Sequence, residues 1–269
     1  MLEIINKNGV FLLKSTVLKS RHGFSTRIGG ISELEYTSSL NLAFGRGESE
    51  DIVLKNVEIF ANALEVDAKK IISVPQIHSN FVRAVDNTHA GEGIYKKHTL
   101  ECDGYVTDVN DLPIAVKTAD CVPILLEARN DKGEVLAVSA VHSGWRGTAD
   151  RIVCYSVEGL TSFGAGAENI YAAIGPCINE CCYEVGPDFA DAILEKLGQN
   201  YYNKFIKVKE NGSIFADLVG MNLELLLSCK VPRNNIDISN YCTYCNKKLF
   251  YSHRRQNGKR GSMMNLICK

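Results

Sequence analysis

Residues 135–153 read VLAVSAVHSGWRGTADRIV and combine three local signals. Residues 135–141 are apolar and rich in β-branched side chains, as in a strand buried within a sheet. Gly144 and Gly147 indicate a tight turn, and apolar residues recur at helical spacing from Ile152 onward. We therefore expect a strand, a glycine turn and the start of a helix, with exposed backbone N–H groups that suit an anion.

Further elements lie on both sides of this stretch. Other short apolar segments, typical of buried strands, are 71–74, 81–85, 114–116, 122–126 and 170–174. Helices are expected from residue 49 onward, where Val53, Val57, Phe60 and Leu64 lie at helical spacing, and over 189–197 and 218–227. Residues 87–101 are expected to form a surface loop and 236–267 a β-rich tail. No repeat or Pro/Gly/Ser-rich linker divides these elements, which predicts one domain over 1–269.

The composition excludes several classes of protein. With 45% hydrophobic and 23% charged residues, the 269-residue chain has the composition of a globular protein with a large core. Thirty Lys and Arg against 31 Asp and Glu give a formal charge of -1, which provides no field for nucleic acid or an anionic membrane. No apolar run is long enough to span a membrane, and residues 1–13 lack the features of a signal peptide. We therefore expect a cytoplasmic protein whose ten cysteines are reduced thiols.

Three residues that can bind a metal follow or end expected strands: His78, Cys121 and His142. Two imidazoles and one thiolate form a ligand set for catalytic zinc, which leaves its fourth position to water. The intervals of 43 and 21 residues match no chelating motif, so spacing does not decide the matter.

The same side chains permit other interpretations. Cys121 could be a buried thiol, with both histidines satisfied by hydrogen bonds and no chemical role. Cys121 could also be a nucleophile activated by His142 or His78, with Asp120 or Ser79 orienting the base. A Cys–His hydrolase and a non-catalytic partner-binding protein therefore stay open beside a zinc enzyme.

Arginines in or near turns are candidates for anion binding. Arg27 precedes two consecutive glycines, Arg146 lies in the turn of 144–147, and Arg254 follows a short β-rich segment. Guanidinium groups can bind phosphate through two parallel hydrogen bonds, and exposed backbone N–H groups favour an oxyanion nearby. Neither glycine turn has the spacing of a P-loop or of a dinucleotide-binding motif.

Cys242 and Cys245 form a lone Cys-x-x-Cys motif. A structural zinc would require a second pair such as Cys177 and Cys181, whose spacing is not a common one. A redox dithiol is weakly indicated as well, because the motif does not open a helix after a first strand. The motif alone therefore assigns no metal.

Nine motifs occur in order over nearly the whole chain. They are GFSTRIGGIS (23–32), SLNL (39–42), QIHS (76–79), DGYVT (103–107), TADCVP (118–123), HSGWRGT (142–148), IGP (174–176), CYEV (182–185) and YSHRR (251–255). Together they resemble the YlmD/YfiH family, also labelled the multicopper polyphenol oxidase or laccase-domain family. That family includes purine nucleoside phosphorylases related to mammalian FAMIN.

The resemblance implies a single α+β domain, a layered α/β/β/α sandwich with mixed sheets. It implies one zinc ion per chain, held by His78, Cys121 and His142 at the active centre. It also implies that purine nucleosides and phosphate are the partners. Adenosine, inosine and 5′-methylthioadenosine would be split to the free base and (methylthio)ribose 1-phosphate, with adenosine deaminase activity in the same site.

Roles for further residues follow from the motifs that carry the resemblance. Arg27 and Arg254 are expected to hold phosphate and Asn41 to contact substrate, with Arg146 a further candidate. Deamination requires a proton shuttle, for which Asp120 is the nearest acidic residue in the sequence.

Copper-dependent polyphenol oxidation is the alternative that the family label implies. It is disfavoured, because the chain has six histidines and no His-x-His pair, whereas a multicopper site needs many clustered imidazoles. The additional thiols of Cys102 and Cys245 could bind stray copper or a second metal ion.

Overall fold

Two stacked β-sheets form the centre of the structure, a computed structural model that describes residues 2–269, so that Met1 of the expected domain lies outside the described residues. The first sheet has the strand order β1-β2-β3-β14-β6 and the second β13-β9-β7-β8-β5-β4. The strands of the first sheet are β1 Glu3–Lys7, β2 Val10–Lys14, β3 Arg21–Ser25, β6 Ile114–Thr118 and β14 Met263–Cys268. Those of the second are β4 Val82–Ala84, β5 Gly104–Thr107, β7 Val122–Arg129, β8 Val135–Ser143, β9 Ile170–Ile174 and β13 Ile236–Ile238.

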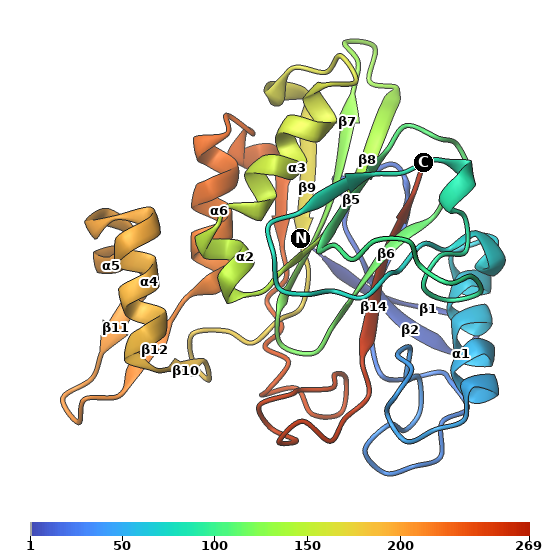
Figure 1. Cartoon of the computed structure of the whole chain (residues 1–269), viewed down its shortest axis with the longest axis horizontal. Helices are drawn as coiled ribbons and strands as arrows, with labels where there is room; N and C mark the ends of the chain where they lie inside the picture. The colour runs from blue at the N-terminus through green and yellow to red at the C-terminus, as the bar shows by residue number, and fades with distance from the viewer. Residues whose placement is uncertain (1) are drawn as a thin grey trace.

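Helices cover the outer faces of both sheets (Figure 1). Helix α1 (Glu50–Ala63) lies against the first sheet, whereas α2 (Trp145–Ala149), α3 (Ile152–Thr161) and α6 (Leu218–Ser228) lie on the side of the second. Beyond them, α4 (Pro187–Leu197) and α5 (Gln199–Phe205) accompany a small sheet of β10 (Glu184–Val185), β12 (Ile214–Ala216) and β11 (Ile206–Val208). Short 3-10 helices are η1 Ala68–Lys70, η2 Asn87–His89, η3 Ala167–Asn169 and η4 Arg233–Asn235. Among residues 2–269, no helix has the length and apolarity needed to cross a membrane.

Three apolar cores hold these layers together. Between α1 and the first sheet lie Val57, Phe60, Leu12 and Leu266; between the sheets lie Phe24, Leu125 and Val138; under the outer helices lie Ile124, Val153 and Leu225. All of these side chains are buried, and each contributes about 1.5–3 kcal/mol relative to an exposed side chain. The expected α/β/β/α layering of one α+β domain is therefore confirmed.

The sheets differ in strand direction. In the second sheet β13 runs parallel to β9 and β4 parallel to β5, while its other neighbours are antiparallel. All strand pairs of the first sheet are antiparallel. The expected strands near 81–85, 114–116, 122–126, 135–141 and 170–174 and all four expected helices are present, α3 beginning at Ile152, and residues 87–101 form a loop that includes η2.

The prediction of a strand over 71–74 is wrong. Ile72 makes only an isolated parallel bridge with Ile114. Beyond that point the side-chain amide of Gln76 takes over, since Lys117 donates its backbone N–H to Gln76 Oε1 (2.7 Å) and accepts from Nε2 (2.8 Å). A side chain thus supplies the hydrogen bonds that a neighbouring strand would make.

The prediction of a β-rich tail over 236–267 is also wrong in its middle. Only β13 and β14 are strands, and the chain between them turns repeatedly. Phe250 and Tyr251 are fully buried there without belonging to a strand. Their apolar side chains give this segment the composition of a buried strand, which is why the pattern predicted one.

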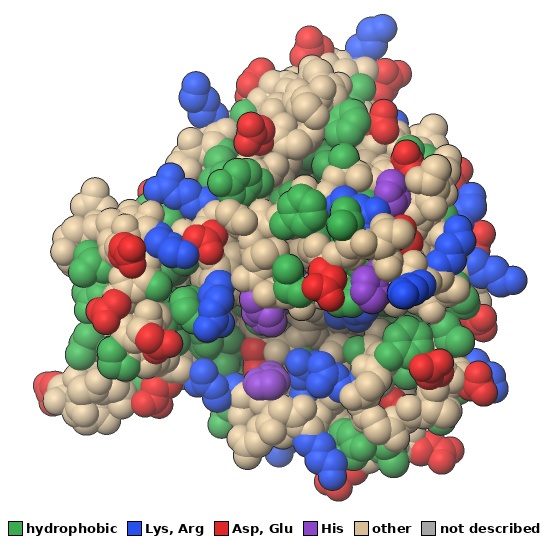
Figure 2. All heavy atoms as spheres, in the orientation of Figure 1, with side chains coloured by type: hydrophobic (Ala, Val, Ile, Leu, Met, Phe, Trp, Pro, Cys, Tyr) green, Lys and Arg blue, Asp and Glu red, His purple; other side chains and the backbone are tan. Residues whose placement is uncertain are grey.

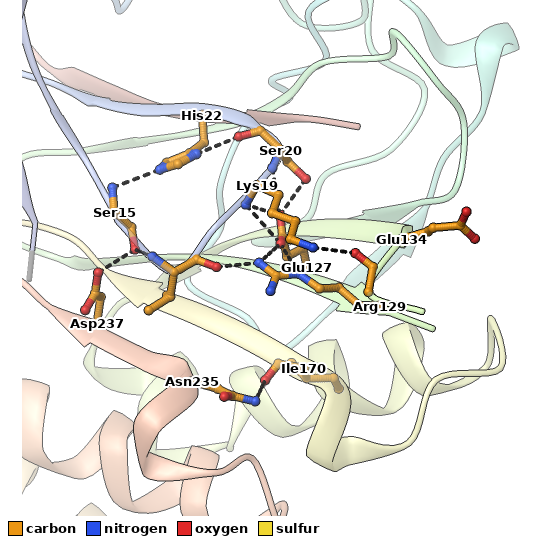
Figure 3. A network of polar contacts seen from close by, with 12 residues as sticks. Ser15, Lys19, Ser20, His22, Glu127, Arg129, Glu134, Ile170, Asn235 and Asp237 are labelled. Carbon is orange, nitrogen blue, oxygen red and sulfur yellow. Dashed lines mark hydrogen bonds and ion pairs between the residues drawn. The ribbon is translucent and has the colours of Figure 1, made fainter. Parts of the chain in front are cut away.

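Buried carboxylates tie the two sheets together at one edge (Figure 3). Glu127 on β7 accepts from the backbone and hydroxyl of Ser20 and pairs with Arg129. Asp237 on β13 accepts from the Ser15 hydroxyl at 2.7 Å. The loop between β2 and β3 is therefore anchored to the second sheet by charge-assisted hydrogen bonds.

Candidate metal centre and its pocket

His78, Cys121 and His142 meet although they are far apart in the sequence. His142 lies near the end of β8, and β7 pairs with β8 so that Pro123 faces His142, which places Cys121, just before β7, beside it. One ligand atom from each of the three residues lies within 4.8 Å of the others, and the two imidazole rings meet edge to face with centroids 4.9 Å apart. We call these three residues the triad.

Gly144 keeps the space around the triad free. A Cβ atom at this position would lie 3.0 Å from His78 Cδ2, 3.4 Å from His142 Cε1 and 3.6 Å from Cys121 Sγ. A side chain at this position would crowd His78 and contact His142 and Cys121, whereas glycine leaves the space beside them free. Two imidazoles and a thiolate around one point, with an open side, fit a catalytic zinc ion.

Asp103, directly before β5, positions both histidines. Its carboxylate accepts from His142 Nδ1 at 2.8 Å, from the backbone N–H of Ile77, His78 and Ser79, and from the Ser79 hydroxyl. The bond to Nδ1 leaves Nε2 of His142 free for a metal. Burial opposes the charge of Asp103, yet these donors lower its pKa.

The backbone beside two ligands is strained. His78 has φ 60° and Asp120, which precedes Cys121, has φ 97°, both in the left-handed region that costs about 1–3 kcal/mol for residues other than glycine. Asp103 holds the first of these conformations through the N–H groups around His78. Asp120 holds the second, since its carboxylate accepts from the hydroxyls of Thr243 (2.6 Å) and Ser252 (3.0 Å).

Electrostatic attraction sets the protonation of the triad. Burial alone would raise the pKa of Cys121, but the charge of His142 and hydrogen bonds from both imidazoles lower this pKa to about 6. Burial alone would lower the pKa of His142, but Cys121 and Asp103 raise this pKa to about 9. A thiolate is therefore available at neutral pH, as both metal binding and nucleophilic attack require.

The triad lines a pocket of about 530 Å³. The side chains around it come from the loop after β3, from the segments before and after β4, from β6 and from the segment before β14. The lining residues include Phe44, Arg46, Gln76, His98, Lys117, Arg260 and Ser262. Histidine, lysine and arginine side chains gather around a hollow on the face seen in Figure 2.

Three cations in this pocket have no acidic partner. No salt bridge among residues 2–269 involves Arg46, Lys117 or Arg260. Nε of Arg46 and Nε of Arg260 are buried without a hydrogen-bond acceptor. Burial, with repulsion from Arg46, lowers the pKa of Lys117 to about 8 and that of Arg260 to about 10. Positive charges crowded in this way, with unpaired donors, favour an anionic ligand.

The arginines expected to bind phosphate do not line this pocket. The guanidinium of Arg27 donates to the carbonyls of Ser38, Glu35 and Lys247 and lies 4.7 Å from the Tyr251 ring centroid. It borders a separate surface hollow.

Arg254 and Arg146 are similarly engaged elsewhere. Arg254 donates from its guanidinium to the Glu184 carbonyl at 2.7 Å. Arg146 is exposed and covers the Trp145 ring at 4.1 Å.

Asn41 is buried behind the pocket wall. Its Nδ2 donates to the Ala43 carbonyl and to Glu48, while Oδ1 accepts from the backbone N–H of Ala43 and Ser262. Ala43 and Ser262 line the pocket, so Asn41 shapes it through the backbone.

Sequence reasoning missed Arg46, Lys117, Arg260 and the role of Asp103. Arg46 lies between Gly45 and Gly47, so it has glycines nearby as Arg27 does. Lys117 and Arg260 carry no local signal. Asp103 belongs to a recognised motif, but only the structure shows that it binds His142.

Residues 21–269 match the family described as "Multi-copper polyphenol oxidoreductase laccase". The chain belongs to this family. It is 32% identical over 250 residues to purine nucleoside phosphorylase YlmD of Bacillus subtilis, covering 91% of this chain and 87% of that protein.

Two further relatives of this laccase-domain family are close. Adenosine deaminase RL5, from an unknown prokaryotic organism, is 34% identical over 234 residues, covering 86% of this chain and 87% of that protein. The crystal structure of YlmD from Geobacillus stearothermophilus superimposes with a TM-score of 0.89 at 29% identity, covering 98% of this chain and 97% of that one. The resemblance to the YlmD/YfiH proteins is therefore confirmed.

Proposed function

We propose that this protein is a zinc-dependent purine nucleoside enzyme. It would split adenosine, inosine and 5′-methylthioadenosine with phosphate, giving the free base and (methylthio)ribose 1-phosphate, and would also deaminate adenosine. One observation carries the proposal: a single pocket contains the triad and three cations without acidic partners. The phosphorylase and deaminase names of the relatives support the same chemistry.

The triad would hold one zinc ion through His78, Cys121 and His142. Zinc, when bound, supplies a Lewis acid that activates water and stabilises developing negative charge. Copper clusters need more imidazoles than the two in the triad, so oxidation of polyphenols is not proposed.

The remaining groups of the pocket would bind and orient the reactants. Arg46, Lys117 and Arg260 would hold phosphate, because all three line the pocket of the triad and Nε of both arginines is buried without an acceptor. Arg27 and Arg254 do not line this pocket. Phe44 offers an aromatic face for the purine.

Asp103 would keep His142 in the tautomer with the proton on Nδ1. Asp120 as the proton shuttle of the deaminase stays a prediction. Its oxygens accept hydrogen bonds from Thr243, Ser252 and the backbone of Arg254, so a donor must move before it can exchange protons with substrate.

Product chromatography tests this function. The purified protein is incubated with adenosine, with and without phosphate, alongside a chelator-treated sample. Adenine formed only with phosphate establishes phosphorolysis, and inosine in either buffer establishes deamination. Loss of both on chelation ties them to the metal, whereas adenosine untouched in every sample at high enzyme concentration refutes the proposal.

A Cys–His hydrolase is a second candidate, because Cys121 lies beside His142 in the pocket. It requires activity that survives chelation and is lost when an electrophile labels Cys121. The chelated sample of the same experiment therefore separates the two candidates.

A further inference from the structure

A second group of potential metal ligands lies outside the pocket. It consists of Cys181, Cys182, Cys242 and Cys245, which we call the cysteine cluster. The four sulfur atoms lie within 4.8 Å of one another, with Sγ of Cys245 at 3.3 Å from Cys182 and 3.8 Å from Cys181. Four thiolates around one zinc ion at about 2.3 Å lie about 3.8 Å apart, so the observed separations bracket those of such a site.

The two turns that carry the cysteines are held together by the backbone. Cys181 and Cys182 follow β9, while Cys242 and Cys245 follow β13, which is parallel to β9 in the same sheet. The backbones of Cys177 and Cys242 then form an isolated parallel β-bridge, and the N–H of Thr243 donates to the Cys177 carbonyl at 2.8 Å. The convergence therefore comes from the sheet and does not depend on the sulfur atoms.

Hydrogen bonds around the cluster suit anionic sulfur. The backbone N–H of Asn179 donates to Sγ of Cys242 at 3.4 Å. The guanidinium of Arg255 donates to the carbonyls of Thr243 and Tyr244, which places a fixed positive charge against the Cys-x-x-Cys loop. Both features are typical of the second layer of contacts around a metal-bound thiolate.

The cysteine cluster contains Cys182 in place of Cys177, which the sequence suggested as the partner of Cys181. Cys177 is buried and directs its thiol to the Asn179 side chain at 3.7 Å. All four cluster cysteines are free thiols. A disulfide would use only two of them, whereas a tetrahedral metal uses all four.

We propose that Cys181, Cys182, Cys242 and Cys245 bind a structural zinc ion. Four protein ligands leave no open position, so this ion would hold structure and perform no chemistry. Thr243, between two of the ligands, donates its hydroxyl to Asp120, the residue before Cys121. The site therefore fastens the loop that supports one member of the triad.

Metal content of the full-length protein tests this proposal. Zinc per chain is measured for the wild type, for Cys242→Ser/Cys245→Ser and for the matched control Cys154→Ser/Cys229→Ser, which alters two neighbouring thiols elsewhere. The cluster variant should lose about one zinc ion per chain and the control none. Equal zinc in all three proteins overturns the proposal, whether or not the pocket is catalytic.

A spectroscopic measurement covers the case in which the cluster variant does not fold. Cobalt(II) is added to the reduced, metal-free full-length Cys121→Ala protein, in which the triad is incomplete. Strong charge-transfer and ligand-field bands of tetrahedral cobalt with four thiolates support the site. Their absence overturns it, as does a disulfide between Cys182 and Cys245 found by mass spectrometry in the protein as purified.

Discussion

The triad and the cysteine cluster both gather side chains that can bind a metal from distant parts of the chain, but in opposite settings. The triad offers three ligands of mixed type beside a pocket, and Gly144 keeps its surroundings free. The cysteine cluster offers four ligands of one type on two surface turns. The number of protein ligands and the space beside them therefore separate a site suited to chemistry from one suited to holding the fold.

Replacement of Cys121 is expected to reduce turnover more than any other change considered for the two sites. Cys121→Ala removes a triad ligand, and losing several kcal/mol of metal-derived stabilisation slows turnover by about 10³-fold or more. Cys245→Ala, in the cluster, should change kcat by less than about tenfold. Turnover of adenosine by both variants is the measurement, and equal losses would show that the two sites do not differ in role.

Asp103→Asn should weaken the triad without removing a ligand. Asp103 orients His142 and the segment around His78, and loss of such a contact costs about 10–100-fold in metal affinity or activity. Competition with a chelator measures the affinity of the pocket metal. Asp237→Asn, at the sheet edge in Figure 3, is the matched control and should leave this affinity unchanged.

Arg260→Gln should affect phosphate rather than metal. One charged hydrogen bond is worth about 1.5–3 kcal/mol, so the KM for phosphate should rise about 10–100-fold while zinc content stays the same. Arg27→Gln is the control. A larger rise in phosphate KM for Arg27→Gln than for Arg260→Gln would instead assign phosphate binding to Arg27, as the sequence motifs predict.

The smallest expected effect concerns the contribution to acid stability of His22, a buried histidine that belongs to neither site. His22 is buried, accepts from the Ser15 N–H through Nε2 (2.9 Å) and contacts the Ser20 carbonyl through Nδ1 (2.7 Å), so it is held neutral (Figure 3). Burial lowers its pKa below the unfolded value of about 6.5. As pH falls below that value, the unfolded chain takes up a proton that the folded protein does not, and the free energy of unfolding decreases.

Denaturant unfolding between pH 7 and 5 tests this prediction with His22→Gln. The variant should lose less stability with acid than the wild type does. Both proteins contain the triad and the cysteine cluster, so acid release of metal cancels in the difference. His89→Gln, a change in a surface turn, controls for the loss of one histidine, and identical slopes for wild type and His22→Gln would contradict the assignment.

Much of the fold could be predicted from local pattern. Strands such as β7 and β9 are buried throughout or nearly so, and therefore read as continuous apolar runs. The segment 71–74 has the same composition, but the N–H groups of 72–74 donate to the carbonyls of Pro113 and Glu92 and to the Tyr105 hydroxyl, contacts that no local pattern encodes. Burial can be read from a sequence, whereas the source of each backbone hydrogen bond cannot.

The site was predictable in its chemistry and not in its geometry. The residue types of His78, Cys121 and His142 suggest zinc, yet intervals of 43 and 21 residues say nothing of distance. The pairing of β7 with β8 supplies part of the missing information. The cysteine cluster likewise depends on the pairing of β9 with β13, which brings Cys182 rather than Cys177 beside Cys245.

The turn after β8 also determines where the tryptophan fluorescence of this protein originates. Trp145 is the only tryptophan of the chain, and it directly follows Gly144, the residue that faces all three triad side chains. Its ring contacts Arg146 and Phe189, at 4.1 Å from the guanidinium carbon and 5.5 Å from the phenyl centroid. All tryptophan fluorescence of this protein therefore originates from the first residue of α2, which gives a label-free signal from the turn that faces the triad without any engineered probe.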